Sequence, residues 1–172
     1  MQKVLGVRAI IFVAVGFFIT FTQSHSAATG LFALAVFGIG LAVANIAATI
    51  WDKRNYLSVE SLPLTLISLA VGLFAVLIPQ SDSTAQALAF VYLVSGWAVL
   101  SGAIELYLAN RSGFRTRAGK DGLITVVLGL GLGLLFLIAP LDIVSAVGFF
   151  GAYLVICGVH LGIAALTPQK WL

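Results

Sequence analysis

The stretch LAVGLFAVLIP, residues 69–79, has two close counterparts elsewhere in this chain of 172 residues. A glycine between bulky apolar residues, followed seven residues later by a turn residue, occurs three times: Val15-Gly16-Phe17 before Gln23, Val71-Gly72-Leu73 before Pro79, and Leu132-Gly133-Leu134 before Pro140. Each copy lies in a unit of two apolar stretches joined by a short polar turn. Such repetition is typical of helical repeat proteins. The sequence therefore predicts three antiparallel helical hairpins, at residues 1–54, 58–111 and 119–170.

Composition indicates that lipid surrounds most of the chain. Hydrophobic residues make up 61% of the sequence and charged residues only 9%, too few polar groups to cover a water-soluble globule. A bilayer core about 30 Å thick needs roughly 20 helical residues, and six continuous apolar stretches approach that length: Val4–Phe21, Leu31–Trp51, Leu62–Ile78, Ala85–Ala109, Gly122–Ala139 and Ile143–Leu166. They lack the polar alternation of barrel strands. We predict an all-α, integral membrane six-helix bundle that forms one transmembrane domain.

The basic residues are predicted to lie on one side of the membrane. They precede the first stretch or follow the second, fourth and sixth: Lys3, Arg8, Lys53, Arg54, Arg111, Arg115, Arg117, Lys120 and Lys170. The opposite turns contain no lysine or arginine. The positive-inside rule therefore places both termini in the cytoplasm. A cleaved secretory signal is the alternative for the first stretch, but that stretch is also half of a repeat.

Turn residues set the expected helix boundaries. Asp82, Asp121 and Asp142 each precede an apolar stretch and are typical residues for capping a helix N-terminus. Pro79 and Pro140 lie where the third and fifth stretches end, because proline cannot continue the hydrogen-bond ladder of a helix.

Three polar residues lie at similar depth in the even-numbered stretches, where lipid should penalise them. Asn45, Glu105 and His160 each stand six to eight residues before a basic or proline residue, which places them about 9–12 Å inside the predicted cytoplasmic boundary. Glu105 should therefore face the bundle and find a hydrogen-bond donor. One hypothesis is a proton-responsive pair of Glu105 and His160 with Asn45 beside it. The alternative is that these side chains only hold the bundle together.

Small residues predict where helices approach closely. Gly129 and Gly133 are four residues apart, as are Gly158 and Gly162, and glycines at this spacing mark helix–helix interfaces in membranes. Packing within one chain is the first interpretation. An interface with a second copy of the chain is the alternative.

The sequence gives no argument for an enzyme. No metal-ligand spacing and no nucleophile with a recognisable base occur, and Gly-x-Gly-x-Gly at 129–133 lies inside an apolar stretch with no strand before it. The basic residues are dispersed along membrane boundaries, so a pI near 9.3 does not indicate nucleic-acid binding. We predict no cofactor, no metal and no nucleic-acid partner. Attraction of residues 111–120 to anionic lipid headgroups is expected instead.

A family resemblance adds a physiological expectation. Two segments, LAVGLFAVLIP at 69–79 and LVSGWAVLSGAIELYLANR at 93–111, resemble the repeat of the HdeD family of small bacterial acid-resistance membrane proteins. The resemblance implies a six-helix protein of the bacterial cytoplasmic (inner) membrane with a link to acid stress, and no reaction or catalytic residue. The chain departs from the family pattern at Gln23, which replaces a turn proline, and at Leu161, which replaces the acidic residue that aligns with Glu105.

Two functional hypotheses follow. The leading one is stress protection through a structural or partner-binding role in the membrane, with lipids and a second copy or another membrane protein as partners. The alternative is a proton or small-solute channel or transporter that uses the polar layer around Glu105. The small number of internal polar residues favours the first.

Overall fold

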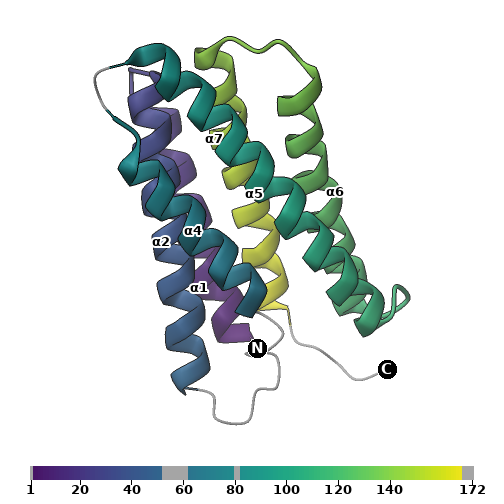
Figure 1. The fold of residues 1–172 in the computed structure, drawn as a ribbon. Coiled ribbons are helices and arrows are strands. Elements are labelled where there is room, and N and C mark those ends of the chain that lie inside the picture. The colour runs from purple at the N-terminus through teal and green to yellow at the C-terminus, as the bar shows by residue number, and fades with distance from the viewer. Residues whose placement is uncertain (1, 52–61, 80–81, 168–172) are drawn as a thin grey trace.

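The computed structural model describes residues 2–51, 62–79 and 82–167, and these residues form α-helices and no strand (Figure 1). The six helices are α1 (Gln2–Phe21), α2 (Ala27–Trp51), α4 (Leu62–Leu77), α5 (Ser83–Ser112), α6 (Arg117–Ile138) and α7 (Ile143–Leu166). The all-α prediction is confirmed. Within the described part of the chain, five helices are long and apolar enough to cross a membrane, and α4 is a shorter apolar helix of 16 residues.

Three helices form the inside of the bundle. Helices α2, α5 and α7 contact one another, whereas each remaining helix lies over two of them: α1 over α7 and α2, α4 over α2 and α5, and α6 over α5 and α7. Successive helices run in opposite directions, so α1, α4 and α6 begin at the end of the bundle where α2, α5 and α7 stop (Figure 1). We call this the basic end, because Arg111 and Arg117 lie there.

The most extensive packing joins helices of different predicted hairpins. It pairs α1 with α7, α2 with α4, and α5 with α6. The repeated glycines lie at these crossings, where a Cβ atom would come to 2.9 Å from the nitrogen of Val155 at Gly16, 2.9 Å from that of Ile39 at Gly72, and 3.3 Å from that of Val99 at Gly133. The two shorter distances leave no room for a Cβ atom, and the third is tighter than an ordinary contact. In lipid, this close van der Waals contact is a main source of attraction between helices.

Aromatic rings fill the middle of the inner helices. Phe37 of α2 meets Trp97 of α5 edge to face at 4.9 Å between ring centroids, and Trp97 lies 6.0 Å from Tyr153 of α7. Phe150 contacts both Phe37 and Phe90, at 5.9 and 5.8 Å. These five side chains are at most 8% exposed. Their rings therefore close the centre of the bundle with apolar atoms.

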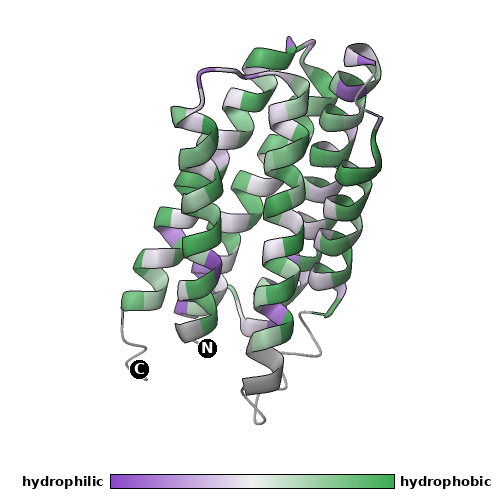
Figure 2. Ribbon diagram, turned by 90° about the vertical axis from the view of Figure 1, so that its left-hand side faces the viewer, coloured by the Kyte–Doolittle hydropathy of each residue, from purple (hydrophilic) through white to green (hydrophobic). Residues whose placement is uncertain are grey.

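Apolar side chains also cover the outward faces of the helices. Large hydrophobic residues are more than half exposed on each outer helix, among them Ile10, Phe74 and Val127. Figure 2 shows hydrophobic colouring along most of the helical surface, with hydrophilic colouring concentrated toward the two ends. A chain with an apolar core and an apolar surface is suited to lipid rather than water.

Two of the three predicted helix caps are confirmed. Asp82 accepts hydrogen bonds from the N–H groups of Thr84 and Ala85 at the start of α5, and Asp142 accepts one from Ser145 at the start of α7. The prediction for Asp121 is wrong. Helix α6 begins a full turn earlier, at Arg117, because Thr116 caps it by accepting from the Gly119 N–H at 3.0 Å.

The prediction that the basic residues lie outside the apolar stretches needs a correction at Arg8. Arg8 lies inside α1, with its side chain only 17% exposed, rather than before the first span. The positions of Lys53, Arg54 and Lys170 fall outside the described residues. Residues 113–116 alone separate α5 from α6.

Enlarging Gly72 tests the helix crossings. Gly72→Ala should lower the free energy of unfolding by about 1–3 kcal/mol, because the added methyl group would overlap the backbone of α2. The matched control is Gly131→Ala, where no atom lies within 4 Å of the added carbon. Denaturant titration in detergent measures both. Equal stability of the two variants would contradict close packing of α4 on α2.

Asp142 should make the stability of α7 depend on pH. The hydrogen bond from the Ser145 hydroxyl, at 2.6 Å, and that from the Ser145 N–H, at 3.0 Å, hold the pKa of Asp142 below its ordinary value of 3.8. A lowered pKa in the folded state means that the stabilisation is present above that ordinary value and is lost as the pH falls through the folded value.

Thermal melting of native protein, Asp142→Ala and Asp142→Asn measures this effect. Native protein should exceed Asp142→Ala near neutral pH, and the difference should shrink below about pH 4. Asn caps without a titrating charge, so Asp142→Asn should show no such pH-dependent loss. A native advantage that stays constant down to pH 2 would rule out the ionised cap.

Candidate functional site

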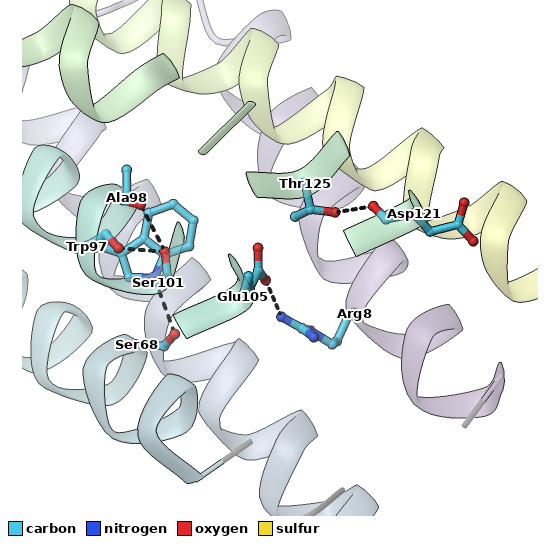
Figure 3. Close-up of polar contacts among 8 residues, drawn as sticks. All are labelled: Arg8, Ser68, Trp97, Ala98, Ser101, Glu105, Asp121 and Thr125. Carbon is cyan, nitrogen blue, oxygen red and sulfur yellow. Dashed lines mark hydrogen bonds and ion pairs between the residues drawn. The ribbon is translucent and has the colours of Figure 1, made fainter. Parts of the chain in front are cut away.

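An ion pair inside the bundle is the centre of the candidate site. Arg8 Nη2 of α1 lies 3.5 Å from Glu105 Oε1 of α5, and the two side chains are 17% and 18% exposed. Figure 3 shows Arg8 reaching from α1 toward Glu105. The residues are 97 positions apart in sequence, so the pair exists only because the fold brings α1 to α5. A carboxylate in this apolar setting requires such a partner.

Arg8 and Glu105 make one long contact. One guanidinium nitrogen approaches one carboxylate oxygen, in place of the two parallel bonds that an arginine fork can form. Arg8 Nε is buried and has no hydrogen-bond partner within the described part of the chain. The pair therefore neutralises charge but leaves part of the hydrogen-bonding capacity of Arg8 unused.

His160 has a different partner from the one hypothesised. Its Nε2 lies 3.1 Å from the backbone carbonyl oxygen of Asp121, which ties α7 to α6. A carbonyl oxygen can only accept, so Nε2 carries the hydrogen and donates it. The same oxygen also accepts from the Thr125 hydroxyl at 3.3 Å. The hydrogen bond of Glu105 goes to Arg8, so the structure does not form the Glu105–His160 pair.

The predicted polar layer thus divides between separate contacts. Asn45 is buried on α2, with 5% exposure. Glu105 joins α5 to α1, whereas His160 joins α7 to α6. Each of the three inner helices contributes one of these polar residues, and Glu105 and His160 serve different interfaces. This arrangement suits links between helices better than a shared proton site.

Other buried hydroxyl groups also form hydrogen bonds, either within α5 or to a neighbouring helix. Ser101, one turn before Glu105, donates to the carbonyl of Trp97 at 2.6 Å (Figure 3). Trp97 Nε1 in turn donates to Ser68 Oγ of α4 at 3.3 Å, and Ser95 Oγ donates to the Gly133 carbonyl of α6 at 3.1 Å. The last two bonds connect α5 to its outer neighbours α4 and α6.

The glycines predicted to mark packing differ in how tightly they are enclosed. A Cβ atom at Gly158 would lie 2.9 Å from the Val13 nitrogen, and one at Gly133 would lie 2.7 Å from a Val99 methyl group. At Gly129 and Gly162 the nearest atoms stand at ordinary distances of 3.6 and 3.9 Å. Gly158 and Gly162 also line an outward, apolar groove of about 370 Å³ between α1 and α7, together with Ala9 and Ala14.

The site offers no evident metal chemistry. Among the residues that the structure describes, no group of three His, Cys, Asp or Glu side chains lies close enough to hold an ion. Cys157 is fully buried on α7 with its thiol free. The arrangement can neutralise a charge and fasten helices.

Arg8 is the site residue that sequence analysis missed. The charge pattern places it before the first apolar stretch, although Val4–Phe21 contains it. The available signal was simple: one cation and one anion, each inside an otherwise apolar helix, must each find a partner. What sequence spacing could not show is that α1 passes within reach of α5.

Comparison with known proteins adds no relative. No family model, curated protein or solved structure matches this chain.

Removing one partner of the ion pair should be costly. Glu105→Gln should lower the free energy of unfolding by about 3 kcal/mol, because Arg8 then keeps a buried charge without a counter-ion. The matched control is Asp121→Asn, which removes a pair with Arg117 that is long (3.9 Å) and exposed. That change should cost less than about 1 kcal/mol.

A double-mutant cycle identifies the true partner. Glu105 should couple strongly to Arg8 and only weakly to His160, as measured from the stabilities of the single and double Gln variants. A larger coupling between Glu105 and His160 would contradict the observed pairing.

Proposed function

We propose that this chain is an HdeD-like, multi-pass protein of the bacterial inner membrane that protects cells from acid stress through a structural or partner-binding role. Apolar helices of membrane-spanning length and an apolar outer surface support the membrane location. Arg111, Arg115, Arg117 and Lys120 lie in or beside the turn between α5 and α6, at one end of the bundle. By the positive-inside rule this end faces the cytoplasm, which puts both termini there.

We also propose that the three hairpins are copies of one unit. Gly16, Gly72 and Gly133 each meet the backbone of an inner helix from another hairpin, in the same relative position. Each hairpin supplies one outer and one inner helix, and each outer helix covers two inner ones. Threefold repetition accounts for both regularities.

The closed aromatic centre is the observation that carries the structural role. Phe37, Trp97 and Tyr153 occupy the middle of the three inner helices and are almost fully buried. A hydrated route for protons or solutes would have to pass these rings. The polar contacts nearby link one helix to another. A bundle that is held closed in this way suits a structural role without catalysis or cofactors.

The alternative is a proton or small-solute channel or transporter that uses the layer around Glu105. One observation favours it: Arg8 and Glu105 keep 17% and 18% of their side chains exposed in an otherwise apolar setting. Charged residues at such depth often belong to ion or proton pathways. In that case the aromatic centre must open during transport.

Partner binding has its own supporting feature. The groove between α1 and α7 is apolar and is bordered by Ala9, Ala14, Gly158 and Gly162. Small residues allow another helix to approach closely in lipid. A second copy of this chain or another membrane protein fits this surface.

Replacing both charges with apolar residues separates the two functions. A buried ion pair can often be exchanged for apolar side chains of similar volume without loss of stability. The double variant Arg8→Met/Glu105→Met should therefore fold, and in the structural proposal it keeps native acid survival. Survival of cells after acid shock, at equal protein abundance, is the first measurement. Proton leakage into vesicles containing a pH-sensitive dye is the second, and native protein should leak no more than empty lipid.

Three outcomes would overturn parts of this proposal. Leakage through native protein that the double variant lacks would establish the transport alternative. Lost survival in a folded, equally abundant double variant would show that the charges do more than hold helices. Equal survival of cells with and without native protein would remove the acid-protection role.

A further inference from the structure

The turn between α5 and α6 has a fixed shape. Gly113 adopts a positive φ of 84°, which side-chain-bearing residues rarely adopt. Thr116 closes the turn by donating from its N–H to the Gly113 carbonyl at 3.0 Å and by capping α6. Gly119 packs directly against the backbone of Gly113, with no room for a side chain between them. Side chains on this turn are therefore presented from a defined backbone.

The turn carries a concentrated positive charge. Arg111, Arg115, Arg117 and Lys120 are all exposed, and Asp121 is the one acidic residue between positions 111 and 121. The Arg117–Asp121 contact is 3.9 Å long, and Arg117 is 48% exposed. An exposed pair of this length neutralises little charge. Most of the basic charge at this turn therefore faces outward.

Exposed aromatic side chains accompany these charges. Phe114, in the turn itself, is 44% exposed, and Tyr107, near the end of α5, is 61% exposed. Aromatic rings next to basic side chains are typical of the zone where a bilayer changes from hydrocarbon to headgroups. The combination matches a surface that is apolar on one side and anionic on the other.

We propose that residues 111–120, which are the turn and the helix ends beside it, bind the headgroups of anionic phospholipids, with Phe114 reaching toward the acyl chains and Arg115, Arg117 and Lys120 toward the phosphates. The outward apolar faces of α5 and α6 bring the turn to the edge of the bilayer. An acidic protein would supply the charges but would give Phe114 no hydrocarbon phase. Lipid therefore matches both the basic side chains and Phe114, whereas an acidic protein matches only the basic side chains.

The opposite end of the bundle provides an internal comparison. The turn between α1 and α2 contains no lysine or arginine, and neither does the turn between α6 and α7. The proposal therefore predicts a lipid preference confined to the α5–α6 turn rather than a general property of the protein.

Short-range fluorescence quenching in vesicles tests this preference. A fluorophore is attached to Ser112→Cys, beside the turn, or to Ser24→Cys at the opposite end; both positions are exposed and native Cys157 is fully buried. Vesicles contain phosphatidylglycerol or phosphatidylcholine with a nitroxide on the headgroup. Quenching of the Ser112→Cys label should favour phosphatidylglycerol, and the preference should weaken as salt is raised. The Ser24→Cys label should show no preference.

The charge variant Arg115→Gln/Arg117→Gln/Lys120→Gln completes the test. One basic side chain near an anionic surface changes affinity by about fivefold, so the phosphatidylglycerol preference at the Ser112→Cys label should fall at least fivefold. Circular dichroism checks that the variant keeps its helices. Equal quenching by both lipids in the native background, or a preference that survives in the variant, would overturn the proposal. Binding of soluble polyglutamate without any lipid preference would assign the surface to an acidic protein instead.

Discussion

The close approach of helices at glycine crossings is the constraint on which this fold depends. Lipid tails are as apolar as the side chains they touch, so burying a leucine between two membrane helices gains little. Contact must come from backbones that lie near one another, and Gly16, Gly72 and Gly133 provide it. These crossings join helices of different hairpins, including the first helix to the last. The bundle is therefore a closed ring in which each hairpin is fastened to the next.

The same surroundings determine what polar side chains can do. Water is absent from the hydrocarbon region, so a buried hydroxyl, imidazole or carboxylate must bond within the protein. Ser95, Trp97 and His160 each donate to a group on a neighbouring helix, and Glu105 accepts from Arg8. Every one of these bonds also connects an inner helix to an outer one. The same contacts therefore give the buried polar groups their hydrogen-bond partners and hold the inner and outer helices together.

The helices were predictable from sequence, whereas their partners were not. Apolar length located all six, and Asp82 and Asp142 marked two starts, because capping depends on a few adjacent residues. The prediction of a cap at Asp121 was wrong for a local reason: Thr116 lies after the Gly113 turn and caps α6 earlier. The Arg8–Glu105 pair was not predictable for a different reason, because it depends on the packing of distant helices. Nothing in the spacing of either helix encodes which helix lies opposite, and only the folded bundle brings Arg8 to Glu105.

The position of the charges within the proposed repeat argues that the copies have diverged. Two positions are equivalent in the three hairpins. The first lies six residues after the residue that a crossing glycine meets, and it holds Asn45, Glu105 and Leu161. The second lies eight residues before a crossing glycine, and it holds Arg8, Leu64 and Thr125. Each of these two positions therefore carries a charge in only one of the three copies. The positive charge, Arg8, lies in the first hairpin, and the negative charge, Glu105, lies in the second. Arg8 extends to α5, which is not one of the two helices that α1 covers. A threefold set of ion sites would need three such pairs; one pair between two copies instead fixes a single asymmetric link at the basic end.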